Sequence, residues 1–106
     1  MKKFLIITKS GSVYRLLYFG NSVSKHSNIH LVPVAGVSMS AGIYPVAKLT
    51  KNSDIYGDGG LYGHYYDDDK KGCVIPQKLI KHAVGKYIVL LNGGHTTTIT
   101  EVYEEV

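Results

Sequence analysis

The residues best suited to chemistry gather between positions 54 and 72, where the chain reads DIYGDGGLYGHYYDDDKKG. This stretch contains five aspartates, five glycines, four tyrosines and one histidine. Carboxylates and imidazole bind metal ions, glycine-rich turns can surround phosphates, and tyrosines are frequent in protein-binding loops. The same stretch therefore has to be tested against three kinds of site.

A calcium-binding loop of the EF-hand type is excluded by two lysines. With Asp67 at the first position of such a loop, Asp69 and Gly72 take the third and sixth positions as required. However, Lys71 takes the fifth position, and Lys78 takes the twelfth, where a bidentate glutamate is needed. We expect no EF-hand here.

Phosphate and metal sites are also poorly supported. The glycines at 57–60 lack the Gly-Lys-Ser/Thr ending of a P-loop, and the aspartates around them would repel phosphate. His64 precedes Asp67, Asp68 and Asp69, but consecutive side chains point in different directions in regular backbone. We therefore predict no bound metal and no cofactor.

Protein binding is the function that this stretch favours. Tyrosine offers a large amphipathic surface at low entropic cost, and neighbouring glycines let a loop adapt to a partner. The aspartates oppose a nucleic-acid backbone, so a protein partner with a basic patch fits better. The predicted partner-binding residues are Tyr56, Tyr62, His64, Tyr65, Tyr66, Asp67, Asp68 and Asp69.

Catalytic patterns are scarce in this chain. His95-Thr96-Thr97 contains one His-x-Thr triplet of the kind that two-histidine phosphoesterases use in pairs, but no second copy occurs. The single cysteine, Cys73, cannot form an internal disulfide. Because general acid–base catalysis needs only scattered residues, a small hydrolase or nuclease using His95 or His64 remains an alternative function.

Charge is distributed unevenly along the chain. Residues 1–53 carry seven basic and no acidic side chains, whereas residues 54–106 carry five basic and eight acidic ones. This asymmetry indicates either a face that binds a polyanion or two complementary surfaces, unless the fold mixes the two halves. A second alternative is therefore nonspecific nucleic-acid binding through Lys2, Lys3, Lys9, Arg15, Lys25, Lys48 and Lys51.

These residues must be positioned by a β-rich scaffold. Two apolar runs, 3–8 and 13–19, flank a short polar segment with a glycine, which predicts a hairpin. Residues 20–28 are polar and predict a surface loop. Further on, prolines and glycines break an apolar stretch into short strands near 30–35 and 43–49.

The second half of the chain predicts one helix and another hairpin. Apolar residues recur at helical spacing over 76–84, with Pro76 at the start and Gly85 at the end. Strand-like runs at 86–91, expected to be central, and 95–103, expected nearer an edge, flank an Asn-Gly-Gly turn. The predicted fold is mainly β (α+β): a small antiparallel sheet or partly open barrel with two hairpins and a short helix.

Size and composition define the general class of protein. A chain of 106 residues with 44% apolar residues predicts a single domain over 1–106. No apolar run approaches the roughly 20 residues that span a bilayer, so a cytoplasmic protein without membrane contact is expected. The leading interpretation is a non-enzymatic interaction protein, an inhibitor or accessory factor of a phage or mobile element, with a homo-oligomer as a further expectation.

Overall fold

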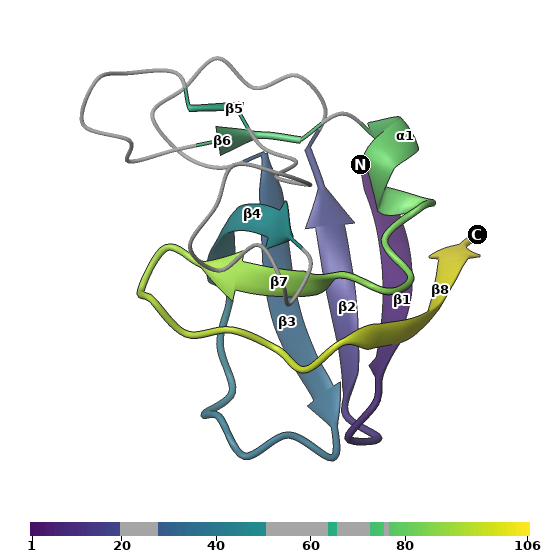
Figure 1. Ribbon diagram of the computed structural model, residues 1–106, viewed down its shortest axis with the longest axis vertical. Helices are drawn as coiled ribbons and strands as arrows, with labels where there is room; N and C mark the ends of the chain where they lie inside the picture. The colour runs from purple at the N-terminus through teal and green to yellow at the C-terminus, as the bar shows by residue number, and fades with distance from the viewer. Residues whose placement is uncertain (20–27, 51–63, 66–72, 76) are drawn as a thin grey trace.

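Six antiparallel strands form one curled sheet in the computed structural model (Figure 1). The structure describes residues 1–19, 28–50, 64–65, 73–75 and 77–106. The strand order is β7-β4-β3-β2-β1-β8, and β5 pairs with β6 in a separate two-stranded sheet. The elements are β1 Lys2–Thr8, β2 Val13–Tyr18, β3 Ile29–Ala35, β4 Tyr44–Thr50, β5 His64–Tyr65, β6 Cys73–Val74, α1 Gln77–Ile80, β7 Tyr87–Leu90 and β8 Ile99–Glu105. The predicted fold class is confirmed.

The first hairpin lies where the sequence predicts it. β1 and β2 pair antiparallel, from Lys2 opposite Tyr18 to Ile7 opposite Val13. Buried and less buried side chains alternate along both strands, as expected when one face of a sheet packs on a core. β3 then pairs with β2, so the first three strands form a meander.

The next two strands also match the predicted positions, and proline limits how they pair. The described ladder between β3 and β4 joins His30 to Pro45 and Leu31 to Tyr44. Proline has no N–H to donate to a ladder, although the carbonyl of Pro45 accepts a hydrogen bond from Leu91 N at 3.0 Å. β4 continues onto β7, so it connects the meander to the C-terminal strands.

The predicted hairpin at the end of the chain is only partly correct. Residues 95–103 do not form one strand beside β7, because the regular pairing is limited to an isolated bridge between Val89 and His95. Next to this bridge, Thr96 N donates to Ile88 O at 2.9 Å, but Ile88 N donates to the hydroxyl of Thr96 at 3.1 Å. A side chain thus replaces a backbone carbonyl, and the ladder stops. β7, expected to be central, is therefore the last strand in the sheet order.

β8 returns to β1 and brings the two ends of the sheet together. Its pairs run from Lys3 opposite Glu105 to Thr8 opposite Ile99. On its other side, Ile99 N donates to the carbonyl of Lys86, just before β7, at 2.7 Å. Ile99 in β8, one end strand of the sheet, is therefore hydrogen-bonded to the residue just before β7, the other end strand. Figure 1 shows the resulting half-barrel with the two chain termini near each other.

The core lies on the concave face of this sheet. Its members come from β1, β2, β3, β4, β7 and β8, and residues around α1 close it from the end where the chain begins and finishes (Figure 1). Burying side chains of this size stabilises the fold by roughly 1.5 to 3 kcal/mol each. The fully buried apolar residues include Phe4, Ile6, Leu16, Ile29, Leu31, Val46, Leu49, Ile75, Ile80, Ile88 and Ile99.

The helix predicted over 76–84 is shorter than expected. Only α1 is helical, and the next backbone hydrogen bonds, from His82 and Ala83, reach back three residues instead of four. The chain then turns at Gly85, whose φ of 87° suits glycine, and the N–H of Gly85 bonds to the start of β8. Docking onto β8 therefore competes with a further helical turn.

Asn28 is buried, although the sequence predicts it at the end of a surface loop. Its side chain is 0% exposed and holds both backbone groups of Ile75: Asn28 Nδ2 donates to Ile75 O at 3.2 Å, and Ile75 N donates to Asn28 Oδ1 at 3.0 Å. Phe19 N also donates to Asn28 O at 2.8 Å. The amide thus substitutes for a strand neighbour and joins parts of the chain that are 47 residues apart.

None of the helices that the structure describes has the length and apolarity to cross a membrane.

Candidate functional site

A cavity of about 620 Å³ opens at the end of the sheet that carries the β1–β2 turn. This end is opposite α1 and the chain termini (Figure 1). Three segments surround the opening: the turn at 9–12, the connection after β3 at 36–40, and the connection after β7 at 91–98. We call it the end cavity.

The end cavity has an apolar floor because the strands deliver alternate side chains to the concave face. Tyr14, Leu31 and Leu90 are buried members of the core that also face this space. Val37, Met39 and Tyr44 are partly buried and pack against the same core. Aromatic rings and a thioether together provide a surface that suits apolar and aromatic groups.

The rim is polar, and four hydroxyl groups connect its segments. Ser10 Oγ lies 3.1 Å from Thr8 Oγ1, 3.2 Å from Ser12 Oγ and 3.0 Å from Thr97 Oγ1. Ser12 donates to the carbonyl of Gly36 at 2.7 Å. Since a carbonyl only accepts, the proton of Ser12 is used by Gly36, and Thr8 Oγ1 donates to the carbonyl of Ser12 at 3.4 Å. Donation from Thr97 to Ser10 and from Ser10 to Ser12 is consistent with these bonds. We call Thr8, Ser10, Ser12 and Thr97 the hydroxyl cluster.

Glycine allows two of the rim segments to approach closely. Gly36 has a φ of 65°, and a Cβ at this position would lie 3.1 Å from the carbonyl oxygen of Gly11. A larger residue would therefore be strained and would push the β1–β2 turn away. Together with the hydroxyl cluster, this contact holds the opening in one shape.

His95 lines the cavity on the opposite segment, and its hydrogen bonding defines its tautomer. Nδ1 lies 3.0 Å from the carbonyl oxygen of Thr96, so Nδ1 carries the proton, and in the neutral ring Nε2 is the acceptor. The ring also makes an edge contact with Tyr87, with centroids 5.3 Å apart and an angle of 62°. His95 is thus oriented with an acceptor nitrogen available.

The described lining residues carry no permanent charge. They include serine, threonine, asparagine, histidine, tyrosine and apolar side chains, but no lysine, arginine, aspartate or glutamate. The described neighbours that bond to or stack on His95 are Thr96 and Tyr87, so no carboxylate orients its ring as in a catalytic triad. This chemistry is suited to binding an uncharged group.

Two residues of the predicted partner-binding stretch lie in the part of the chain that the structure describes. Of its residues, His64 and Tyr65 form strand β5, which pairs with β6, from His64 opposite Val74 to Tyr65 opposite Cys73. The residues that lie outside the described part of the structure are Tyr56, Tyr62, Tyr66, Asp67, Asp68 and Asp69. Their role stays a prediction.

The basic residues predicted to bind nucleic acid are partly engaged with glutamates of β8. Arg15 donates to Glu105 through two nitrogens, Nε to Oε1 at 2.7 Å and Nη2 to Oε2 at 3.2 Å. This hydrogen bonding is the largest cause that lowers the pKa of Glu105 and raises the pKa of Arg15. The fold thus places acidic residues from the second half of the chain beside basic residues from the first half.

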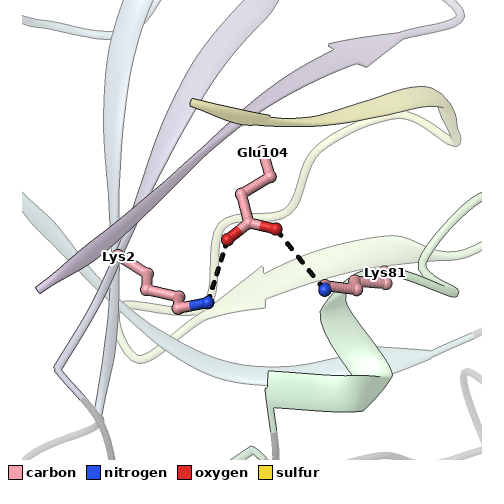
Figure 2. Close-up of polar contacts among 3 residues, drawn as sticks. All are labelled: Lys2, Lys81 and Glu104. Atoms are coloured by element: carbon pink, nitrogen blue, oxygen red, sulfur yellow. Dashed lines mark hydrogen bonds and ion pairs between the residues drawn. The ribbon is translucent and has the colours of Figure 1, made fainter. Parts of the chain in front are cut away.

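A second ion-pair group joins β1, β8 and the turn after α1. Figure 2 shows Glu104 between two lysines: Lys2 Nζ lies 3.0 Å from Oε1, and Lys81 Nζ lies 3.4 Å from Oε2. The hydrogen bond from Lys2 is the largest cause that lowers the pKa of Glu104. Of the other predicted basic residues, Lys3 and Lys9 are exposed on the described chain, and Lys48 contributes backbone to β4, whereas Lys25 and Lys51 lie outside the described residues.

The sequence singles out His95 only as a candidate catalytic residue of the alternative hydrolase or nuclease, and it does not predict this cavity. The Lys-Ser-Gly-Ser segment at 9–12 predicts only a turn, and the threonines at 96–98 predict a strand that includes a single His-x-Thr triplet. A clustering of small hydroxyl residues in two turn-like segments is the signal that was available. It could not show that the two segments meet, because Ser10 and Thr97 are 87 residues apart.

Fold and site together define a small β-rich domain with a cavity at one end of a curled sheet, and the described residues that line this cavity are uncharged. No protein-family model, curated protein or solved structure matches this chain. Within the described residues, no group of three or more His, Cys, Asp or Glu side chains could hold a metal ion.

Proposed function

We propose that this protein is a non-enzymatic interaction domain that binds a protein partner by taking an apolar group of that partner into the end cavity. The observation that carries the proposal is the combination of a buried apolar floor with a neutral, hydrogen-bonded rim. Its volume of about 620 Å³ falls in the range of roughly 300 to 1,000 Å³ typical of binding pockets.

An exposed apolar side chain beside the opening favours a protein as the ligand. Ile43 is 64% exposed and directly precedes Tyr44, which lines the cavity. A partner protein would cover such a neighbouring residue, and a buried anchor surrounded by weaker contacts is the usual arrangement of a protein interface. A shape held by the hydroxyl cluster also lowers the entropic cost of binding.

The narrower expectations from the sequence belong to this proposal. We regard the protein as a cytoplasmic inhibitor or accessory factor of a phage or mobile element. A homo-oligomer is supported by β8, which is the last strand of the sheet order and so offers an edge for pairing. Binding by the 54–72 stretch would add a second contact to the same partner.

Blocking the cavity tests the proposal. Ser38 is exposed and lines the opening, so Ser38→Trp should fill the entrance without disturbing the core. Lys78→Trp adds the same ring on the exposed side of α1 and is the matched control. Each tagged protein is used to capture partners from the source cells, and the purified partner is then titrated into ¹⁵N-labelled protein.

The expected result is capture by the wild type and by Lys78→Trp, with at least a tenfold loss of affinity for Ser38→Trp. Amide resonances of the three rim segments should shift when the partner is added. If Ser38→Trp binds the partner as well as the control does, the end cavity is not the site.

A further inference from the structure

We infer that the group bound in the end cavity is an uncharged aromatic side chain with a hydrogen-bond donor at its tip, tyrosine or tryptophan, and that His95 Nε2 accepts its hydrogen bond. This inference rests on the proposed function and specifies the chemistry of the partner. Three features of the cavity support it: the uncharged lining, the aromatic floor and the hydrogen-bond donors and acceptors of the rim.

The lining of the cavity disfavours charged side chains of a partner. An ionised group that enters the cavity loses hydration, and the described lining residues offer no opposite charge to compensate. A buried charge without a partner is strongly unfavourable. Lysine, arginine, aspartate and glutamate side chains of a partner are therefore excluded from the floor.

The floor favours an aromatic ring over an aliphatic chain. Tyr14 and Tyr44 offer ring faces and edges, and Met39 offers a polarizable sulfur, which makes favourable contacts with aromatic rings. These residues come from β2, from the connection after β3 and from β4, so a ring can be contacted from several sides.

The hydroxyl groups of the rim use most of their protons among themselves. In the hydroxyl cluster, the protons of Ser10 and Ser12 are directed to Ser12 and to the carbonyl of Gly36, and the proton of Thr97 is directed to Ser10. The hydroxyl of Thr96 donates to the carbonyl of Thr97 at 2.8 Å.

The histidine completes this arrangement. Its Nδ1 proton is used by the carbonyl of Thr96, which leaves Nε2 as an acceptor. The other side-chain donors among the described lining residues are the hydroxyl of Tyr14 in the floor and, at the rim, Ser38 and the amide of Asn92, both of which are exposed to water. A phenol O–H or an indole N–H matches an acceptor at this position, whereas phenylalanine does not.

Three capped amino acids distinguish these requirements. N-acetyl-tyrosinamide, N-acetyl-phenylalaninamide and the α-amide of N-acetyl-glutamic acid, whose side chain is a carboxylate, are titrated into ¹⁵N-labelled protein, and dissociation constants are obtained from the amide shifts of the rim segments. We expect the tyrosine amide to bind roughly 3 to 10 times more tightly than the phenylalanine amide, the effect of one net hydrogen bond. The carboxylate should bind at least about tenfold more weakly than the tyrosine amide.

Variants of His95 assign the acceptor. His95→Phe keeps a ring against Tyr87 but removes the nitrogen, so it should abolish the difference in affinity between the tyrosine and phenylalanine amides. His95→Gln keeps an acceptor and should restore part of the difference. His95 is exposed, so neither variant should prevent folding, which the dispersion of the amide spectrum checks.

Equal affinity of the three probes, absence of shifts in the rim segments, or an unchanged preference in His95→Phe would each overturn the inference. The proposed function would survive those results if Ser38→Trp still lost its protein partner. Conversely, tyrosine-selective binding in a protein whose Ser38→Trp variant keeps its partner would refute the protein-binding role of the cavity and, with it, the assignment of the bound ring to a partner's side chain.

Discussion

Replacing Asn28 by leucine should destabilise this protein far more than the small change in side-chain volume suggests. The side chain is fully buried and supplies both a donor and an acceptor to the backbone of Ile75, which is buried as well. Leucine has a similar volume but no polar atom, so the N–H and the carbonyl of Ile75 would stay buried without these partners. Each such loss costs roughly 1 to 3 kcal/mol.

Two losses, partly offset by extra apolar burial, correspond to a destabilisation of about 3 kcal/mol. This is a large share of the roughly 5 to 15 kcal/mol that separates folded from unfolded small proteins. For a domain of about 100 residues, Tm should fall by roughly 12 °C. Urea unfolding of the wild type and Asn28→Leu gives the free energy, and hydrogen exchange of the Ile75 amide reports on the local contact.

Asn92→Leu is the matched control for this experiment. Its side chain also accepts a backbone hydrogen bond, from Gly94 N at 2.8 Å, but it lies in an exposed turn where water can replace it. We expect a loss of about 1 kcal/mol or less. If Asn28→Leu costs no more than Asn92→Leu, or if the Ile75 amide keeps its protection, the assigned role of Asn28 is refuted.

Two further predictions concern the ion pairs and the hydroxyl cluster. The pKa values of Glu104 and Glu105 are lowered in the folded protein, so the unfolded chain takes up more protons in acid. Their stabilisation should be present above the ordinary glutamate pKa of 4.5 and lost as pH falls through the lower folded pKa. Between neutral pH and a pH of about 3, the urea midpoint of unfolding should therefore fall less steeply with pH in the double variant Glu104→Gln, Glu105→Gln than in the wild type. Identical dependence of the midpoint on pH in the two proteins would contradict this. Ser10→Ala removes the centre of the hydroxyl cluster and should cost about 1 kcal/mol and broaden the amide signals of the rim, whereas Thr100→Ala, outside the cluster, should leave those signals sharp.

Local patterns were sufficient to predict the first four strands. The polar turn at 9–12 between two apolar runs encodes its hairpin within about 16 residues of sequence. The prolines of β3 and β4 lie in strands whose described pairing with each other is short. Of the apolar positions expected on the packed face of the helix, 75, 80 and 83 are buried and Leu79 is partly buried, but Val84 is 53% exposed. Helical length was overestimated because periodicity shows which side chains are buried, but not whether the backbone has a competing partner such as β8.

Contacts between distant segments account for the remaining differences. Nothing near Asn28 in the sequence indicates that its amide will meet Ile75, and nothing near the threonines indicates that Thr96 will interrupt the ladder of β7. The end cavity depends on three turns that come together only after the sheet curls. Among the predicted functional residues that the structure describes, His95 lines this cavity, and the role of the 54–72 stretch remains a prediction from composition.

The pairing of β1 with β8 also determines the order in which the molecule can be completed. Lys2 and Glu104 are separated by 102 positions, so nearly the whole chain must be present before β8 can pair with β1. Long-range pairing of this kind slows folding, and until it forms, the edge of β1 is open to other chains. Lys2 and Lys3 begin that strand, and charged lysines discourage edge-to-edge association. The same lysines that later face the glutamates of β8 thus protect the nascent sheet while it is still incomplete.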